Sequence, residues 1–177
     1  MSKQSNEWHM LTLVGQDKPG IVAQITLALF RTGAQLGEAS MMRLGGNFTI
    51  MLMVKSGQSL NELEQSIAPV VAALELHSSF QSINASLHQH EIPNTRITVY
   101  GADRAGIVAD TTSCLLDAGF NIMDLASDVA GDEADPIYIM HIEGIAQNGS
   151  EAIETALEQI KIKGVDIDVT PIDIMIA

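Results

Sequence analysis

The chain has 177 residues and a formal net charge of −13, and apolar residues make up 46% of it. This acidity disfavours direct contact with nucleic acid, whose affinity for proteins comes largely from lysine and arginine neutralising phosphates. The one cysteine, Cys114, excludes an intrachain disulfide and a cysteine-based metal site. Because the N-terminus is polar and no apolar run is long enough to cross a membrane, we expect a soluble, cytoplasmic protein.

The first elements follow from local patterns. Residues 9–14 are rich in β-forming side chains and predict a strand. A turn follows, in which Asp17 is expected to cap the next helix and Pro19 to occupy its first turn. Apolar residues then recur at helical spacing as far as Gly33. Two further strands, over 34–43 and 47–55, are joined by the hairpin signal Gly45-Gly46.

A second helix begins at a capping box made of Ser59 and Glu62, and its apolar stripe runs to Leu74. Pro69 lies inside that stripe and is expected to kink or break the helix near Ala68. A fourth strand over 80–88 and a polar linker over 89–94 complete the first half.

Methionines gather around the first predicted hairpin, at positions 41, 42, 51 and 53. Packing in the core is the expected role, although methionine is also common at adaptable binding surfaces.

The second half of the chain repeats the first. The stretch 15–23, Gly-Gln-Asp-Lys-Pro-Gly-Ile-Val-Ala, returns over 101–109 as Gly-Ala-Asp-Arg-Ala-Gly-Ile-Val-Ala. The copies align at a spacing of 86 residues and then, beyond the acidic loop that precedes Pro136, at a spacing of 90. A match of this length and order indicates a duplication, so we expect two domains, over 8–90 and 94–177.

Each copy reads strand-helix-strand-strand-helix-strand. In the second copy the strands are expected at 96–100, 120–130, 137–143 and 165–174, with helices over 107–118 and 153–160. This order predicts an α+β protein with two ferredoxin-like (βαββαβ) units, each a four-stranded antiparallel sheet with two helices on one face.

The turns carry a more specific signal than the fold. Asp-Lys-Pro-Gly and Asp-Arg-Ala-Gly each lead from a strand end into a helix, and the second is followed by Gly119-Phe120-Asn121-Ile122. In these features the chain resembles the ACT domain, a small regulatory module that commonly binds amino acids. The resemblance covers residues 9–88 and 96–174, and it implies that ACT units pair and hold a ligand between them.

A ligand at the turn also has a physical basis, because the first N–H groups of a helix lack internal partners and attract a carboxylate. Asn121 offers a donor and an acceptor to an amino acid, and Gln35 is its counterpart. The alternative is that the glycines only make a tight turn and that the amides satisfy a strand edge. The candidate ligand-binding residues are Asp17, Lys18, Pro19, Gly20, Gln35, Leu36, Asp103, Arg104, Ala105, Gly106, Ile107, Asn121 and Ile122.

Other functional motifs are not matched. The turn lacks the Gly-Lys-Ser/Thr of a Walker loop and the glycine spacing of a dinucleotide fingerprint. Histidines 9, 88, 90 and 141 identify no complete metal site, the acidic loop does not match an EF-hand, and no catalytic triad can be named. We therefore expect a protein that is not an enzyme and that uses no cofactor or metal.

The resemblance implies a regulator of transcription that represses glycine cleavage genes, with glycine as the signal. Because the chain is acidic and has no helix-turn-helix, it would bind a DNA-binding activator protein rather than DNA. The alternative is a regulatory subunit that confers amino-acid feedback on a metabolic enzyme. Unprotected strand edges also predict pairing of the sheets and a homo-oligomer.

Overall fold

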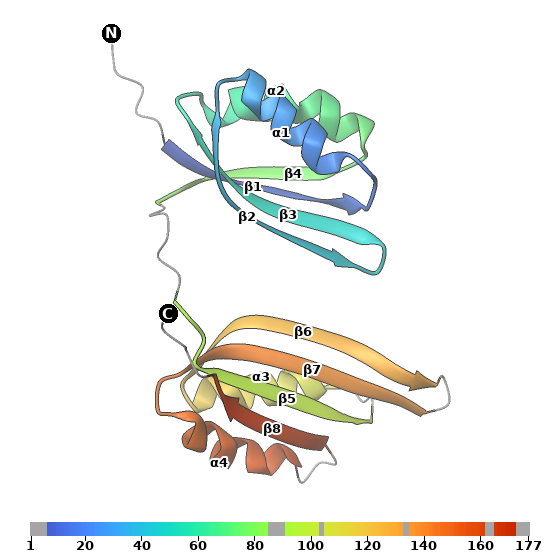
Figure 1. The fold of residues 1–177 in the computed structure, drawn as a ribbon, viewed down its shortest axis with the longest axis vertical. Coiled ribbons are helices and arrows are strands. Elements are labelled where there is room, and N and C mark those ends of the chain that lie inside the picture. Colours follow the sequence, from blue (N-terminus) through green and yellow to red (C-terminus); the bar gives the residue numbers. More distant parts are fainter. Residues whose placement is uncertain (1–6, 85–90, 103–104, 133–134, 162–164, 173–177) are drawn as a thin grey trace. The chain divides into compact units, whose positions relative to one another are not determined.

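The structure, a computed structural model, describes residues 7–84, 91–102, 105–132, 135–161 and 165–172. The chain divides into two compact units, Met1–Gln89 and His90–Ala177. Each unit has its own sheet and its own pair of helices (Figure 1). The domain boundaries predicted from the sequence, 8–90 and 94–177, stay predictions.

Both units have the same order of elements. The first consists of β1 (Glu7–Gln16), α1 (Ile21–Arg31), β2 (Gln35–Leu44), β3 (Asn47–Ser56), α2 (Leu60–Ala73) and β4 (His77–Ile83). The second consists of β5 (Thr95–Ala102), α3 (Ile107–Asp117), β6 (Phe120–Asp132), β7 (Asp135–Ala146), α4 (Ser150–Lys161) and β8 (Val165–Pro171). The sheets are antiparallel, in the orders β2-β3-β1-β4 and β6-β7-β5-β8, and both helices of a unit cover one face (Figure 1). The predicted fold class is therefore confirmed.

The strand registers match between the units at the spacings found in the sequence. Leu11 is paired with Leu52 in the first sheet, and Ile97 with Ile142 in the second. The pairing of β2 with β3 shifts between Leu36 and Ala39, and that of β6 with β7 shifts at the equivalent place. The duplication therefore extends to the irregularity in the edge strand.

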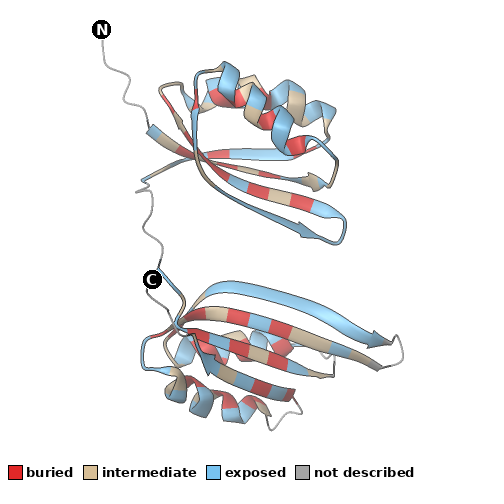
Figure 2. Cartoon of the chain, viewed as in Figure 1, coloured by how far each residue is buried: buried red, intermediate tan, exposed pale blue. Residues whose placement is uncertain are grey.

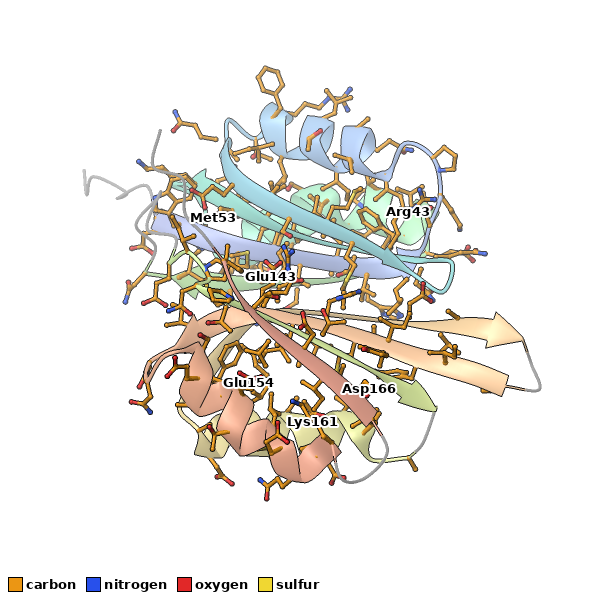
Figure 3. All side chains as sticks on the ribbon, turned by 60° about the horizontal axis from the view of Figure 1, so that its bottom comes forward. Arg43, Met53, Glu143, Glu154, Lys161 and Asp166 are labelled. Carbon is orange, nitrogen blue, oxygen red and sulfur yellow. The ribbon has the colours of Figure 1, made fainter. Side chains whose placement is uncertain are left out.

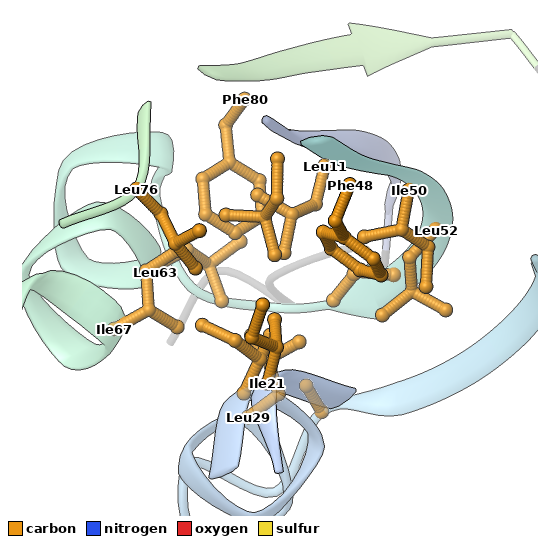
Figure 4. Close-up of a cluster of buried hydrophobic side chains, with 14 residues drawn as sticks. Leu11, Ile21, Leu29, Phe48, Ile50, Leu52, Leu63, Ile67, Leu76 and Phe80 are labelled. Carbon is orange, nitrogen blue, oxygen red and sulfur yellow. The ribbon is translucent and has the colours of Figure 1, made fainter. Parts of the chain in front are cut away.

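The core of the first unit lies between the sheet and its helices. Alternate residues of β1 and β3 point towards the helices, and Leu11, Leu13 and Val54 are fully buried (Figure 4). Leu29 of α1 and Leu63 and Ile67 of α2 close the other side. Side chains without polar groups fill this layer, because a period of two in a strand and of 3.6 in a helix each give one apolar face.

The core of the second unit is built from the equivalent positions. Ile97, Val99, Met140 and Ile142 of the sheet are fully buried beneath Leu115 of α3. Ile153 and Leu157 of α4 are likewise at 0% exposure. Figure 2 shows buried residues gathered between sheet and helices in each unit, while the edge strands β2 and β6 are largely exposed.

Helix α2 begins at the predicted capping box. The Ser59 hydroxyl accepts from the Glu62 N–H, and the Glu62 carboxylate accepts from the Ser59 N–H at 2.8 Å. The break predicted near Ala68 is wrong, because the helix continues past Pro69 to Ala73. Apolar side chains on both sides of Pro69 pack against the core, and this packing offsets the hydrogen bond that proline removes.

Two other expectations need correction. β4 begins at His77 rather than at residue 80, and the expected continuation over 85–88 lies outside the described residues. The acidic loop before Pro136 is shorter than expected, because Gly131 and Asp132 pair with Pro136 and Asp135 as part of a hairpin. Residues 133–134 lie outside the described ranges.

The methionine cluster is mostly not part of the core. Met53 is buried, but Met41, Met42 and Met51 are 55%, 57% and 48% exposed, so core packing is wrong for these three. β2 is an edge strand that the helices do not cover, which exposes Met41. Met42 and Met51 lie on the sheet face that carries no helix, as their register with Thr49 and Thr12 shows.

Candidate functional site

The turn between β1 and α1 presents the start of a helix without a side-chain cap. Gly20 is the N-cap residue with a φ of 87°, a left-handed conformation that favours glycine. No side chain caps α1, so the N–H groups of its first turn stay available to an anion. Gly106 repeats this arrangement before α3, with a φ of 90°.

Both charged side chains of the first turn are held by partners. Asp17 forms an ion pair with Arg43 of β2 and donates its own N–H to the Gly46 carbonyl at 3.0 Å. The expectation that Asp17 caps α1 is therefore wrong, since Gly20 occupies the N-cap. The carboxylate instead ties the turn to the β2–β3 hairpin.

Lys18 is held by the end of α2. Its Nζ donates to Glu75 Oε2 at 2.6 Å and to the Leu74 carbonyl at 3.3 Å, just beyond the end of α2. The hydrogen bond from the Lys18 ammonium and its charge hold the pKa of Glu75 below its ordinary value. Lys18 thus braces the turn against α2 and is not a free cation for a ligand.

A pocket of about 340 Å³ opens beside this turn. Its lining comes from the turn, the start of α1 and the neighbouring hairpin: Asp17, Lys18, Pro19, Gly20, Ile21, Val22, Met41, Arg43 and Phe48. Arg43, labelled in Figure 3, is one of the lining residues and pairs with Asp17. Met41, Arg43 and Phe48 were not among the candidate ligand-binding residues predicted from the sequence. The Gly45-Gly46 hairpin signal could have indicated them, because it places β2 and β3 side by side.

Gln35 and Leu36 lie far from that pocket. They pair with Lys55 and Val54, whereas the turn follows Gln16, which pairs with Asn47. The eight residue steps from Asn47 to Lys55 span roughly 27 Å of strand. Helix α1 runs back along the sheet before β2 begins, so one unit cannot bring its turn and its own Gln35 together.

The second unit has the same separation. Asn121 and Ile122 pair with Ile145 and Gly144 at one end of the sheet, while Gly101, before the turn, pairs with Tyr138 at the other. Asn121 is exposed and lines a different pocket of about 340 Å³, with Glu91, Leu116, Gly119, Phe120, Ile145 and Gln147.

The remaining candidate ligand-binding residues differ in how far they are exposed. Ile107 is buried in the core, and Ala105 and Gly106 are exposed at the turn. Asp103 and Arg104 lie outside the described residues. In both units, therefore, the turn and the amide stay separate, and a site that uses both needs residues from a second ACT unit.

Metal-binding and membrane-spanning features are absent from the described part of the chain. Within those ranges no group of three or more His, Cys, Asp or Glu side chains could hold a metal ion. None of the helices in the described ranges is long and apolar enough to cross a membrane. His88 and His90 lie outside the described residues.

Comparison with known proteins agrees with this architecture. Residues 9–88 match the ACT domain model. Glycine cleavage system transcriptional repressors of Escherichia coli and Shigella flexneri are each 25% identical over 160 residues, which cover 90% of this chain and 84% of the relative.

Two solved structures share the fold across almost the whole chain. One is an unknown protein from Galdieria sulphuraria, 24% identical, with a TM-score of 0.75 and coverage of 96% of this chain and 100% of that one. The other is a protein described as a glycine cleavage system transcriptional repressor by similarity, 15% identical, with a TM-score of 0.67 and coverage of 96% and 99%.

Residues 9–88 therefore match the ACT domain, and the second unit repeats the fold of the first. Over 90% of its length the chain resembles the glycine cleavage system transcriptional repressor. The ACT match and this similarity support a regulatory role.

Proposed function

We propose that the protein is a non-enzymatic, amino-acid-responsive regulator of transcription that represses glycine cleavage genes by binding a DNA-binding activator. The observation that carries this proposal is the similarity to glycine cleavage repressors over 90% of the chain. The ACT domain over residues 9–88 supports an amino acid as the signal, with glycine as the first candidate.

Charge supports an activator rather than DNA as the partner. The net charge of −13 would repel phosphates, and the second half carries most of the excess of acidic residues. A protein of this charge that acts on transcription needs a partner that contacts DNA on its behalf.

The amino acid binds between paired ACT units in this proposal. The uncapped start of α1 or α3 receives the carboxylate, and a second ACT unit supplies the amide of Asn121 or Gln35. The separation of turn and amide within a unit supports this shared site, since neither feature alone could fix both ends of an amino acid.

Affinity capture from the native host, with and without millimolar glycine, tests the regulatory partner. The proposal predicts recovery of a DNA-binding transcription factor in an amount that glycine changes. Recovery of a biosynthetic enzyme instead would support amino-acid feedback on metabolism and contradict the proposal.

A gel-shift assay with the purified protein alone tests the role of charge. No shift of glycine cleavage promoter DNA is expected at physiological salt, and a shift should require the activator. Tight, sequence-specific binding by the protein alone would overturn the activator mechanism.

A further inference from the structure

The helix-free face of the first sheet carries a group of apolar side chains, with Thr12, Ser40 and Thr49 among them. Strand register places the side chains of Met10, Val14, Met42, Leu44, Met51 and Met53 on this side, because they alternate with the buried residues that face the helices. We call these six residues the methionine face.

Most of this face is accessible to solvent. Leu44, Met42, Met51 and Val14 are 70%, 57%, 48% and 44% exposed. Exposed contiguous apolar patches on proteins commonly mark sites of interaction with other molecules. Methionine suits such a surface, since its unbranched, polarisable side chain adapts to the partner it meets.

The methionine face is almost free of charge in a strongly acidic chain. Among the described residues of this side of the sheet, the only acidic one that could border it is Glu38, in the bulge of β2. Lys55 lies over the Trp8 ring at 5.6 Å, and His77 lies on the edge strand β4. Two copies of a chain with a net charge of −13 can therefore meet here with little local repulsion.

The whole helix-free side of this sheet, of which the methionine face is part, reaches the lower end of the size range of stable interfaces. Four strands about 4.8 Å apart, with lengths of up to about ten residues at about 3.4 Å each, give a face of roughly 600 Å². A standard protein interface buries about 800 Å² on each partner. Pairing of two such faces comes close to that area, and the contact would be sheet on sheet.

The equivalent face of the second unit has a different character. Met10, Met42, Met51 and Met53 correspond to Arg96, Asp128, His141 and Glu143 at the spacings of 86 and 90. Asp124, Asp166 and Asp168 extend the acidic surface on the same side of that sheet. Figure 3 labels Met53 in one sheet and Glu143 and Asp166 in the other. Tyr100 and Ile137 on this side are each 43% exposed, so the second face is mixed and acidic where the first is almost free of charge.

We propose that two copies of the chain pair face on face through the methionine face of the first unit. The contact is isologous, with the same residues contributed by each copy about a twofold axis. Burial of the exposed methionines, Val14 and Leu44 stabilises the dimer. Because net charge opposes association and no ion pair supports it, added salt strengthens the dimer by screening.

Sedimentation equilibrium of the full chain and of its Met51→Glu and Met42→Glu variants tests the pairing. We expect the wild type to be dimeric, and each variant to raise the dimer dissociation constant by about tenfold or more, since a carboxylate is then buried in an apolar contact. Both side chains are exposed, so the circular dichroism spectrum should not change.

Phe30→Glu is the matched control, because Phe30 is 73% exposed but lies on α1, on the other side of the sheet. This variant should stay dimeric. Mixing a Met42→Glu/Met51→Glu variant with a Met42→Lys/Met51→Lys variant should restore dimers by opposite charge. A monomeric wild type, or a Met51→Glu variant as dimeric as the wild type, would overturn the proposal.

Discussion

The two units share their interior and differ on their surface. Leu63 and Ile67 of α2 are fully buried, and so are their equivalents Ile153 and Leu157 of α4. On the helix-free faces, by contrast, the methionines of the first unit correspond to ionisable residues of the second. Because packing constrains only the interior, the duplicated sheet could keep one fold while its two exposed faces became apolar in one unit and acidic in the other.

The strands beside the bulged edge strands, β3 and β7, show how far the units have diverged in detail. The position of Val54, which is buried in β3, is occupied by Gly144 in β7. In the second unit the backbone of β6 approaches so closely that a β-carbon at Gly144 would lie 2.1 Å from the Asn121 carbonyl oxygen. The two units therefore pack different residues, Val54 and Gly144, beside the same bulge.

The largest expected effect comes from a cavity in either core. Leu63→Ala and Ile153→Ala should each destabilise the unit that contains them by about 2–5 kcal/mol, since both side chains are fully buried. Trp8, the single tryptophan, reports on the first unit only. Urea unfolding followed by Trp8 fluorescence should shift for Leu63→Ala and not for Ile153→Ala.

Far-UV circular dichroism of the same samples supplies the control, because it reports on both units. There, both variants should shift part of the transition. An equal shift of the Trp8 signal in both variants would mean that the two units unfold as one, against the view of separate cores.

The next effect in size sharpens the difference at the bulge. Gly144→Ala should destabilise the second unit by about 1–3 kcal/mol, because the added methyl group meets backbone that cannot move aside. Circular dichroism during urea unfolding measures the loss. An unchanged midpoint would mean that β6 is not held as close to β7 as the structure has it.

A smaller effect is expected at the start of α2. Ser59→Ala removes the side chain that caps the helix and should cost about 1 kcal/mol in the first unit. Trp8 fluorescence during unfolding detects it. The equivalent helix α4 begins at Ser150, after Gly149 with a φ of 85°. The stability of the second unit should therefore not change in the Ser59→Ala variant.

The capping box also gives the first unit a pH dependence. Hydrogen bonds from Ser59 lower the pKa of Glu62, so its contribution to stability is present above the unfolded pKa and is lost as the pH falls through the folded value. Glu62→Gln keeps a capping side chain and should flatten the Trp8-monitored stability between neutral and acidic pH. If the slope stays the same, Glu62 is not its source.

The smallest expected effect separates the units by charge alone. Residues 1–90 carry 5 basic and 6 acidic side chains, whereas residues 91–177 carry 4 and 16. Added salt screens repulsion between like charges, so it should stabilise the second unit more than the first. Comparison of Trp8 fluorescence with circular dichroism at two salt concentrations measures this. Equal stabilisation would show that the acidic face carries little repulsion.

Much of the fold could be predicted from the sequence, because a repeat with one shift in spacing fixes which positions are equivalent. The predicted order of helices and strands along the chain, the capping box at Ser59 and the glycine turns are all found. The course of α2 past Pro69 could not be predicted, because core packing outweighed a local preference.

The candidate site was less accessible to sequence reasoning. Ion pairs of Asp17 with Arg43 and of Lys18 with Glu75 join residues distant in the chain, and no local pattern indicates them. The separation of Gln35 from the turn could have been foreseen, because a helix after β1 must return along the sheet before β2 begins. The exposed methionines depend on which face the helices cover, and composition does not reveal that.

Calorimetric titration of the full chain with each of the twenty amino acids, together with its melting temperature in the presence of each, tests the central claim most directly. At least one amino acid, with glycine the first candidate, should bind at millimolar concentration or below and raise the melting temperature, because a ligand stabilises the state that binds it. Asn121→Ala combined with Gln35→Ala, two changes at exposed side chains, should abolish that shift without lowering the stability of the free protein. If no amino acid binds, or if binding survives this double change, the proposed site at the turns is contradicted.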